Sequence, residues 1–128
     1  MSKAIANYIA QWAKFTTQGR ASRSEYWNAY LGYFLIALVY AVAINIVISV
    51  AGAIGINMSF LSSISSLVIS AGSLPFIPLG IRRLHDIGIT GWLYLISLTV
   101  VGNIALIVMF CMDSQAGVNK YGANPKGV

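Results

Sequence analysis

The chain has 128 residues, of which 58% are hydrophobic and 9% are charged, and its formal net charge is +5. This composition excludes an ordinary soluble domain, in which about 25% of residues are charged, and the length is that of a single domain. No charged residue lies between Glu25 and Arg82 or between Asp86 and Asp113. Because uncharged apolar stretches of about 18 residues or more are typical of membrane-spanning helices, the sequence predicts an all-α integral membrane protein with about three transmembrane helices.

The positive charge is typical of a membrane protein and predicts no nucleic-acid partner. Lys and Arg concentrate at the cytoplasmic ends of membrane spans, and no DNA- or RNA-binding motif accompanies them. The single cysteine, Cys111, cannot form an intrachain disulfide. No set of residues suggests a metal or cofactor. No compact apolar segment with a small-residue cleavage site follows Lys3, so we expect no cleaved signal peptide.

Residues 2–16 predict a short amphipathic helix ahead of the spans. At helical spacing, one side carries the apolar residues Ile5, Tyr8, Ile9, Trp12 and Phe15. The other side carries Lys3, Asn7, Gln11 and Lys14. Such a helix lies in the headgroup layer of a membrane or packs on the cytoplasmic ends of the spans, and the two arrangements are compatible.

The first span is predicted at about residues 27–51. Ser22 and Glu25 have the spacing of a capping box just before it. Aromatic residues form an interfacial belt over its first turns, namely Tyr26, Trp27, Tyr30 and Tyr33. The following turn around Gly55 has no positive charge, so we expect it on the non-cytoplasmic side.

The second span is predicted at about residues 60–81, with a kink where Pro75 and Pro78 each remove a backbone donor. Every fourth residue of one stretch is a serine: Ser62, Ser66 and Ser70. Small residues let membrane helices approach closely and hydroxyls can hydrogen-bond across, which favours a packing seam over a pore lining. The polar segment 82–90 follows on the cytoplasmic side.

The third span is predicted at about residues 91–112, long enough at about 1.5 Å per residue to cross a ~30 Å hydrocarbon core once. Gly102 and Asn103 are expected to bend it. The polar tail, residues 113–128, has no helical or strand periodicity. Three spans with a cytoplasmic N-terminus place this tail outside, although its net positive charge favours the cytoplasmic side.

Arginines gather on the predicted cytoplasmic face: Arg20, Arg23, Arg82 and Arg83. Either they anchor the spans with snorkelling side chains, or they form a pocket for anionic lipid headgroups or a phosphorylated ligand. Glu25 and Asp86 lie among them, which favours a hydrogen-bonded network. We predict that Glu25 pairs with an arginine of the second segment and clamps the first two spans together. Arg82 and Asp86 are four residues apart and share a face if the helix continues.

The other polar candidates each have a structural and a functional interpretation. His85 precedes Asp86, a pairing that could orient an imidazole for proton transfer, but no second titratable group or metal-ligand set accompanies it, which favours a structural role. Asn45 and Asn103 either hydrogen-bond between helices or line a water path. No charged residue lies at membrane depth, so proton relay and ion coupling lack their usual residues.

Motifs in chain order resemble a known family: Gly19-Arg20-x-x-Arg23-x-Glu25-Tyr26-Trp27, Arg82-Arg83-Leu84-His85-Asp86, Gly91-Trp92 and Asn119-x-Tyr121-Gly122-x-Asn124-Pro125. They cover the chain from about Phe15 to Pro125 and are similar to the YhaH-type inner-membrane family, domain of unknown function 805. The resemblance implies a small multi-pass protein of the bacterial inner membrane with no assigned activity. Family members often have a second aromatic residue at Leu93 and a proline near Val100-Val101, and these departures concern the straightness of the third span.

These observations lead to three hypotheses on function. The first is a non-enzymatic membrane protein whose cytoplasmic face, built from both arginine segments, binds anionic membrane lipid or a partner protein. The second is a small transport or channel subunit that forms a homo-oligomer through the serine-rich second span. The third, ranked last, is a membrane-embedded enzyme that uses His85 and Asp86.

Overall fold

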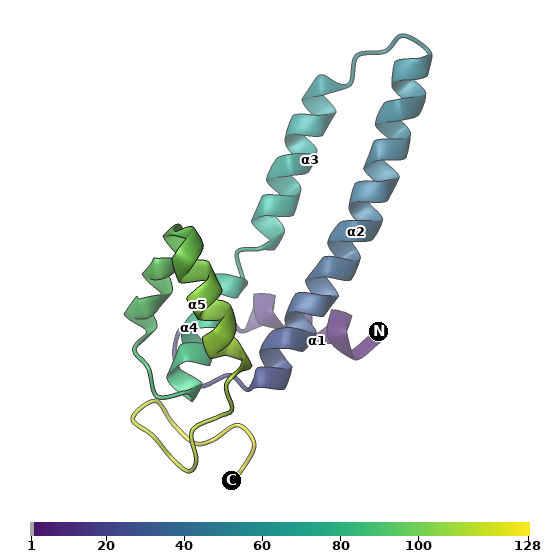
Figure 1. The fold of residues 1–128 in the computed structure, drawn as a ribbon. Coiled ribbons are helices and arrows are strands. Elements are labelled where there is room, and N and C mark those ends of the chain that lie inside the picture. Colours follow the sequence, from purple (N-terminus) through teal and green to yellow (C-terminus); the bar gives the residue numbers. More distant parts are fainter. Residues whose placement is uncertain (1) are drawn as a thin grey trace.

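The computed structural model describes residues 2–128, and within this range all the regular elements are helices, with no extended strand. Two antiparallel helices, α2 (Arg23–Ala53) and α3 (Ser59–Gly72), form a long shaft. The remaining elements gather at one end of this shaft (Figure 1). That end therefore holds both terminal segments and most of the polar residues.

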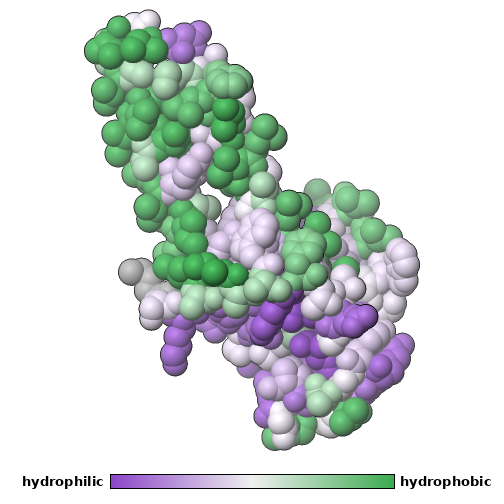
Figure 2. All heavy atoms as spheres, turned by 180° about the vertical axis from the view of Figure 1, so that it is seen from behind, coloured by the Kyte–Doolittle hydropathy of each residue, from purple (hydrophilic) through white to green (hydrophobic). Residues whose placement is uncertain are grey.

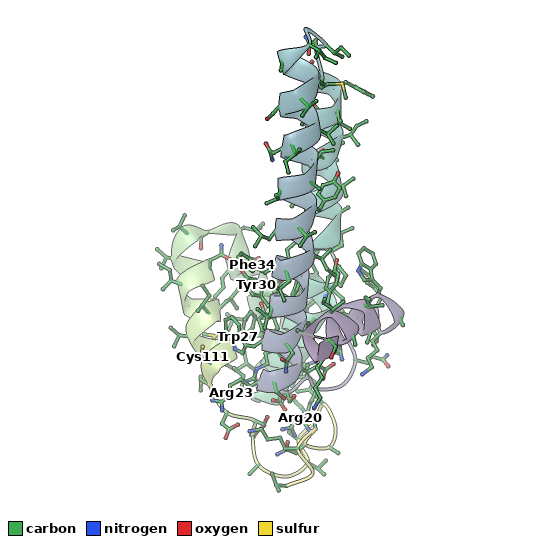
Figure 3. The ribbon with its side chains drawn as sticks, turned by 90° about the vertical axis from the view of Figure 1, so that its right-hand side faces the viewer. Arg20, Arg23, Trp27, Tyr30, Phe34 and Cys111 are labelled. Atoms are coloured by element: carbon green, nitrogen blue, oxygen red, sulfur yellow. The ribbon has the colours of Figure 1, made fainter. Side chains whose placement is uncertain are left out.

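The N-terminal helix α1 (Ser2–Ala13) lies across the foot of α2 rather than along it (Figure 3). A Cβ on Gly32 would stand 2.2 Å from the carbonyl oxygen of Ala4, so only glycine allows this crossing. Tyr8 donates a hydrogen bond of 2.8 Å to the carbonyl oxygen of Gly72 at the end of α3. The amphipathic helix is confirmed, but it ends at Ala13 and leaves Phe15 outside.

Helix α2 begins where the capping motif predicts. The Ser22 hydroxyl accepts a hydrogen bond of 3.1 Å from the backbone N–H of Glu25, which satisfies one of the free donors of the first turn. With 31 residues and a mean hydropathy of 2.6 in its most apolar window, α2 is long and apolar enough to cross a membrane.

The second predicted span, residues 60–81, is divided into α3 and α4 (Phe76–Asp86). The break falls at residues 73–75, where Pro75 has no backbone N–H to donate, so the predicted kink is confirmed as a full interruption. Helix α4 also continues past Ile81, so the first part of the polar segment 82–90 is helical as far as Asp86. By length and composition, the stretch Ser59–Asp86 is the second one able to cross a membrane.

The prediction of one continuous helix over residues 91–112 is wrong. A 3-10 helix, η1 (Gly91–Leu98), runs away from the polar end, and α5 (Val100–Cys111) returns towards it (Figure 1). The chain reverses at Thr99, whose hydroxyl caps α5 by accepting from the Gly102 N–H at 3.0 Å. A Cβ on Gly102 would stand 1.8 Å from the Ile96 carbonyl oxygen, so this close approach requires glycine. With 12 residues, α5 is about 18 Å long, well short of a ~30 Å hydrocarbon core.

Because the hairpin returns, the tail lies beside the arginine segments and not at the opposite end (Figure 1). The Gln115 N–H donates to the Asp86 carbonyl oxygen at 2.8 Å. This placement corrects the expectation, derived from three spans, that the tail and the arginines lie on opposite sides.

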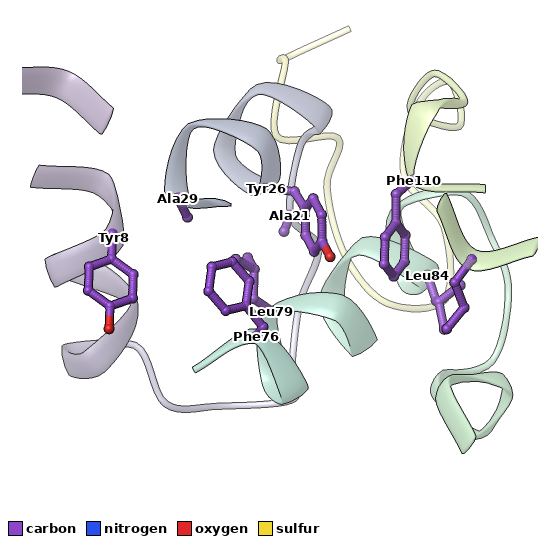
Figure 4. Close-up of a cluster of buried hydrophobic side chains, with 9 residues drawn as sticks. Tyr8, Ala21, Tyr26, Ala29, Phe76, Leu79, Leu84 and Phe110 are labelled. Atoms are coloured by element: carbon purple, nitrogen blue, oxygen red, sulfur yellow. The ribbon is translucent and has the colours of Figure 1, made fainter. Parts of the chain in front are cut away.

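The buried core also lies at the polar end, where α1, α2, α4 and α5 meet (Figure 4). Its members are Tyr8, Ala21, Tyr26, Ala29, Phe76, Leu79, Leu84, Leu106 and Phe110. By contrast, apolar side chains along the shaft are exposed, for example Val39 and Leu67. Figure 2 shows the same division, with a hydrophobic surface over the shaft and a hydrophilic one at the foot. An apolar surface of this extent fits a lipid environment.

Candidate functional site

Asp86 is the centre of the polar network at the foot of the molecule. Its side chain is fully buried, and one carboxylate oxygen accepts from Arg20 Nε at 2.9 Å. The other oxygen accepts from Arg83 at 2.6 Å and from the Ser114 hydroxyl at 2.5 Å. The Asp86 cluster, as we name Arg20, Arg83, Asp86 and Ser114, thus joins the N-terminal segment, α4 and the tail. A buried carboxylate needs such charge-assisted partners to offset its lost hydration.

Arg20 holds the tail to the rest of the protein. Beyond the ion pair, its guanidinium donates to the carbonyl oxygens of Gln115 at 2.6 Å and Gly117 at 2.8 Å, with a longer contact to Gly122 at 3.3 Å. The planar fork of an arginine can supply several donors in fixed directions. One buried side chain therefore fixes several points of a segment without regular structure.

Arg83, which binds the other carboxylate oxygen of Asp86, also contacts the end of the hairpin formed by η1 and α5. It is fully buried and donates to the carbonyl oxygens of Phe110, at 3.3 Å, and Met112. These carbonyls belong to the end of α5, where backbone acceptors lack partners within the helix. The Asp86 cluster thereby also fixes the end of the returning helix.

Arg82 makes a separate contact with α1 and α2. Its guanidinium donates to Glu25 Oε1 at 3.3 Å and to Gln11 Oε1 at 2.6 Å. The predicted pairing of Glu25 with an arginine of the second segment is confirmed, and it joins α2 to α4. Arg82 and Asp86 lie four residues apart on the continued helix, but they do not pair, because Asp86 contacts Arg20 and Arg83. Gln11, which the helical pattern places on the solvent side, is buried beneath this ion pair.

These contacts limit what the arginines can bind. Arg20, Arg82 and Arg83 are buried, and their guanidinium groups donate to groups of the protein itself, although the buried Nε of Arg82 has no partner among the described residues. Arg23 is exposed and lies near the end of α5, where it donates to the Cys111 carbonyl oxygen at 3.3 Å (Figure 3). A lipid headgroup pocket made of all four arginines, which the sequence suggests as one possibility, is therefore not present as an open site.

His85 is turned away from Asp86. Its ring stacks on Tyr121, with centroids 3.8 Å apart and planes 6° from parallel. Its Nδ1 donates to the Gly19 carbonyl oxygen at 3.2 Å, and the Asn119 side chain donates to its backbone oxygen at 2.9 Å. The described residues contain no hydrogen bond between His85 and the Asp86 carboxylate, so they do not form the pair that the catalytic hypothesis needs.

Asn45 and the repeated serines of the shaft hydrogen-bond within their own helices. Asn45 donates to the Ala41 carbonyl oxygen, and the serine hydroxyls donate to preceding carbonyls of α3: Ser62 to Ser59, Ser66 to Ser62 and Ser70 to Ser66. Hydrogen bonds between α2 and α3 are instead made by Tyr33, which donates to the Ile69 carbonyl oxygen at 2.8 Å, and by Tyr40 with the buried Ser65 at 3.3 Å. A transport or channel subunit assembled through the serines stays a prediction.

Asn103 stabilises the tip of the hairpin. Its Nδ2 donates to the carbonyl oxygens of Ser97 at 2.6 Å and Thr99 at 2.9 Å. The Thr99 hydroxyl donates in turn to the Ile96 carbonyl oxygen. In a lipid environment, backbone groups outside a regular helix need such internal partners. Asn103 therefore stabilises the turn between η1 and α5. The sequence left open whether it hydrogen-bonds between helices or lines a water path, and its bond to Ser97 on η1 is of the first kind.

A groove of about 550 Å³ opens beside the Asp86 cluster, between α4 and η1. Its α4 side is formed by Ile77, Ile81 and His85, and its η1 side by Gly91, Trp92, Tyr94 and Leu95. Thr17, Thr90 and Tyr121 complete the lining. Among the residues that the structure describes, no group of three or more His, Cys, Asp or Glu side chains could hold a metal ion.

Two residues of the site carry no sequence signal of their own. Ser114 and Gln115 lie in a tail without periodicity, whereas Asn119, Tyr121 and Asn124 belong to the motif that the family resemblance uses. Asn124 donates to the carbonyl oxygens of Gln115 and Val128, and thus folds the tail upon itself. The residues of this motif are therefore the part of the tail that contacts His85 and Arg20 of the Asp86 cluster.

Comparison with known proteins gives a consistent result. The family model described as "Protein of unknown function (DUF805)" matches residues 14–123. The inner membrane protein YhaI of Escherichia coli K12 is 36% identical over 109 residues, 84% of each chain. The inner membrane protein YhaH of the same strain is 28% identical over 130 residues, 97% of this chain and 93% of that protein. No solved structure matches this chain.

Proposed function

This chain belongs to the DUF805 family, and from that premise we propose that it is a non-catalytic inner-membrane protein that binds anionic phospholipid on its cytoplasmic face. The observation that carries the proposal is the distribution of accessible charge. The exposed cations are Lys3, Lys14, Arg23, Lys120 and Lys126. Among the described residues, Asp86 is buried, Glu25 is half-buried between Arg82 and Lys14, whose Nζ lies 3.9 Å from Oε1, and Asp113 alone is an exposed acid. The foot of the molecule therefore presents a positive surface, as anionic lipid headgroups require.

The tail contributes less to this surface than its lysines suggest. Asp113 pairs with Lys126, and hydrogen bonds from the Lys126 ammonium and the Ser114 backbone lower the pKa of the Asp113 carboxyl. The carboxylate thus stays charged and offsets this lysine. The positive surface consists mainly of Lys3 on α1, Lys14 directly after it, Arg23 at the start of α2, and Lys120.

Helix α1 fits the headgroup layer of a membrane. Its inner face, Ala4, Tyr8 and Gln11, is buried against the other helices. Ile9 and Trp12 stay exposed on another face. A helix with exposed apolar residues beside lysines lies in the interface, with its apolar face in the acyl region and its cations among the phosphates. This placement brings Lys3 and Lys14 to the lipid headgroups.

The proposal includes a membrane topology of two spans, α2 and the stretch Ser59–Asp86, with the hairpin of η1 and α5 entering and leaving on one side. Three observations support it: α5 is too short to cross, Arg20 contacts the tail, and the turn at residues 54–58 has no charge. Because positive charge marks the cytoplasmic side, both ends of the chain are placed in the cytoplasm.

Retention of lipid by the purified protein tests the proposed function. After extraction from vesicles of equal parts phosphatidylglycerol and phosphatidylcholine, native mass spectrometry is expected to find phosphatidylglycerol preferentially on the wild type. Each cation near an anionic surface contributes about 1 kcal/mol, so the triple variant Lys3→Gln, Lys14→Gln, Arg23→Gln should lose about 100-fold of this preference at low salt. The altered side chains are exposed, and an unchanged melting temperature confirms that the fold is intact.

The neutral variant Gln18→Ala, Asn28→Ala is the matched control, because it changes exposed polar residues of the same region without changing charge. It should keep the wild-type preference. An equal preference in the wild type and in the triple variant would show that the positive surface does not select the lipid.

A further inference from the structure

The groove between α4 and η1 has a polarity gradient along its length. Ile77, Ile81 and His85 follow each other at intervals of four residues on α4, so they line one face of that helix over about 12 Å. The end at Ile77 adjoins α3 and the shaft, whereas the end at His85 adjoins the N-terminal segment and the tail. One end is thus apolar and lies towards the hydrocarbon, and the other is polar and lies towards the cytoplasm.

The apolar part of the groove is open to lipid. Trp92 and Leu95 line it and remain largely exposed. Its volume of about 550 Å³ is within the range of about 300–1,000 Å³ typical of ligand sites. A groove that opens sideways from a membrane-embedded hairpin is accessible to a lipid acyl chain without passage through water.

The polar end offers hydrogen-bonding groups and positive charge. Thr17, Thr90 and Tyr121 line it, and Lys120 Nζ lies 5.0 Å from the centroid of the Tyr121 ring. His85 donates through Nδ1 to Gly19, so in the neutral ring its other nitrogen, Nε2, is an acceptor, and the donors at this end are the hydroxyls and Lys120. A Cβ on Gly91 would stand 3.0 Å from Nε2, which locates this atom on the groove side of the ring.

No acid lines the groove. Its lining contains no Asp or Glu, and the neighbouring Asp86 is fully buried between Arg20 and Arg83. A carboxylate at the polar end would repel an anionic headgroup. Because Asp86 is buried away from the groove, the formal charge beside the groove is that of Lys120. The gradient of polarity and the positive charge therefore both favour an amphipathic ligand with an apolar chain and an anionic headgroup.

We infer that this groove binds one anionic phospholipid of the cytoplasmic leaflet. An acyl chain lies against Ile77, Ile81 and Leu95, and the phosphate lies at the polar end, near the hydroxyls and Lys120. This inference rests on the proposed function and adds a single defined site to it. The positive surface attracts anionic lipid, and the groove holds one molecule of it.

Filling the groove tests the site. In the native mass spectrometry experiment described above, Leu95→Trp should reduce retained phosphatidylglycerol about tenfold, the loss expected when about two methylene groups of a chain are no longer buried. Leu98→Trp is the matched control, because it places the same indole at the exposed tip of the hairpin, outside the groove. Ile77→Trp fills the opposite wall and replaces Leu95→Trp if the latter lowers the melting temperature.

The headgroup is tested by Lys120→Gln, which should keep the lipid but reduce the preference for phosphatidylglycerol over phosphatidylcholine about fivefold. Equal retention by Leu95→Trp, Ile77→Trp and Leu98→Trp would overturn the groove site, and an unchanged preference in Lys120→Gln would overturn the placement of the phosphate. If the groove variants retain lipid while the triple surface variant loses its preference, the proposed function stands and the site is wrong. If the wild type shows no preference for phosphatidylglycerol, the proposed function itself fails.

Discussion

Asp86→Asn is expected to lower the free energy of unfolding by about 3–5 kcal/mol, the usual cost of removing one partner from a buried ion pair. The substitution removes the negative charge that compensates Arg20 and Arg83, both of them buried. It also weakens the acceptor of Ser114, so the tail loses one of its attachments. Thermal unfolding in detergent micelles measures the loss of stability, and the rate of tryptic cleavage at Lys120 measures release of the tail.

Asp113→Asn is the matched control for this change. Its carboxylate is exposed and paired with Lys126, and surface substitutions of this kind usually change stability by no more than about 0.5 kcal/mol. If Asp86→Asn unfolds at the same temperature as Asp113→Asn and its tail is cleaved no faster, the Asp86 cluster does not hold the foot of the molecule together.

Gly102→Ala is expected to destabilise the protein by about 3 kcal/mol, the upper part of the range for overpacking. The added Cβ would stand 1.8 Å from the Ile96 carbonyl oxygen, so η1 and α5 must separate at the tip. The sign of the effect is diagnostic. In a straight helix, alanine is more favourable than glycine by about 1 kcal/mol, and the same substitution would stabilise a continuous third span.

Gly52→Ala serves as the control, since this glycine lies in α2 and a Cβ there meets no atom within 4 Å. It should be neutral or slightly stabilising in thermal unfolding. A Gly102→Ala variant at least as stable as Gly52→Ala would contradict the hairpin.

The membrane class and the first half of the fold could be predicted from the sequence because their signals are local. The absence of charge between Glu25 and Arg82 identifies the shaft, Ser22 marks the start of α2, and Pro75 marks the break between α3 and α4. Hydropathy, capping and proline geometry each depend on neighbouring residues only.

The hairpin could not be predicted by the same means. Residues 91–112 are apolar enough and long enough for one span, and hydropathy does not register a reversal at its middle. What decides the fold is a set of contacts at Thr99, Gly102 and Asn103, which satisfy the backbone of the turn. Gly102 and Asn103 predict a bend in the sequence, but the angle of that bend depends on how η1 and α5 pack against α4.

The ion pairs at the polar end were also predictable only in part. That Glu25 meets an arginine of the second segment follows from charge and from the placement of both on one face. The choice of Arg82 for Glu25 and of Arg83 for Asp86 depends on the rotation of α4, and the burial of Gln11 depends on α1 crossing α2 at Gly32. The attachment of the tail to Arg20 involves backbone carbonyls, which have no side-chain signature.

The side of the membrane on which the tail lies tests the central claim most directly, since that claim joins the arginine segments, the hairpin and the tail at one cytoplasmic face. Green fluorescent protein and alkaline phosphatase are fused in parallel after Val128 and, as a control, after Asn57 in the turn between α2 and α3. The account predicts fluorescence without phosphatase activity after Val128 and the reverse after Asn57. Phosphatase activity after Val128 would place the tail on the non-cytoplasmic side and would contradict the account.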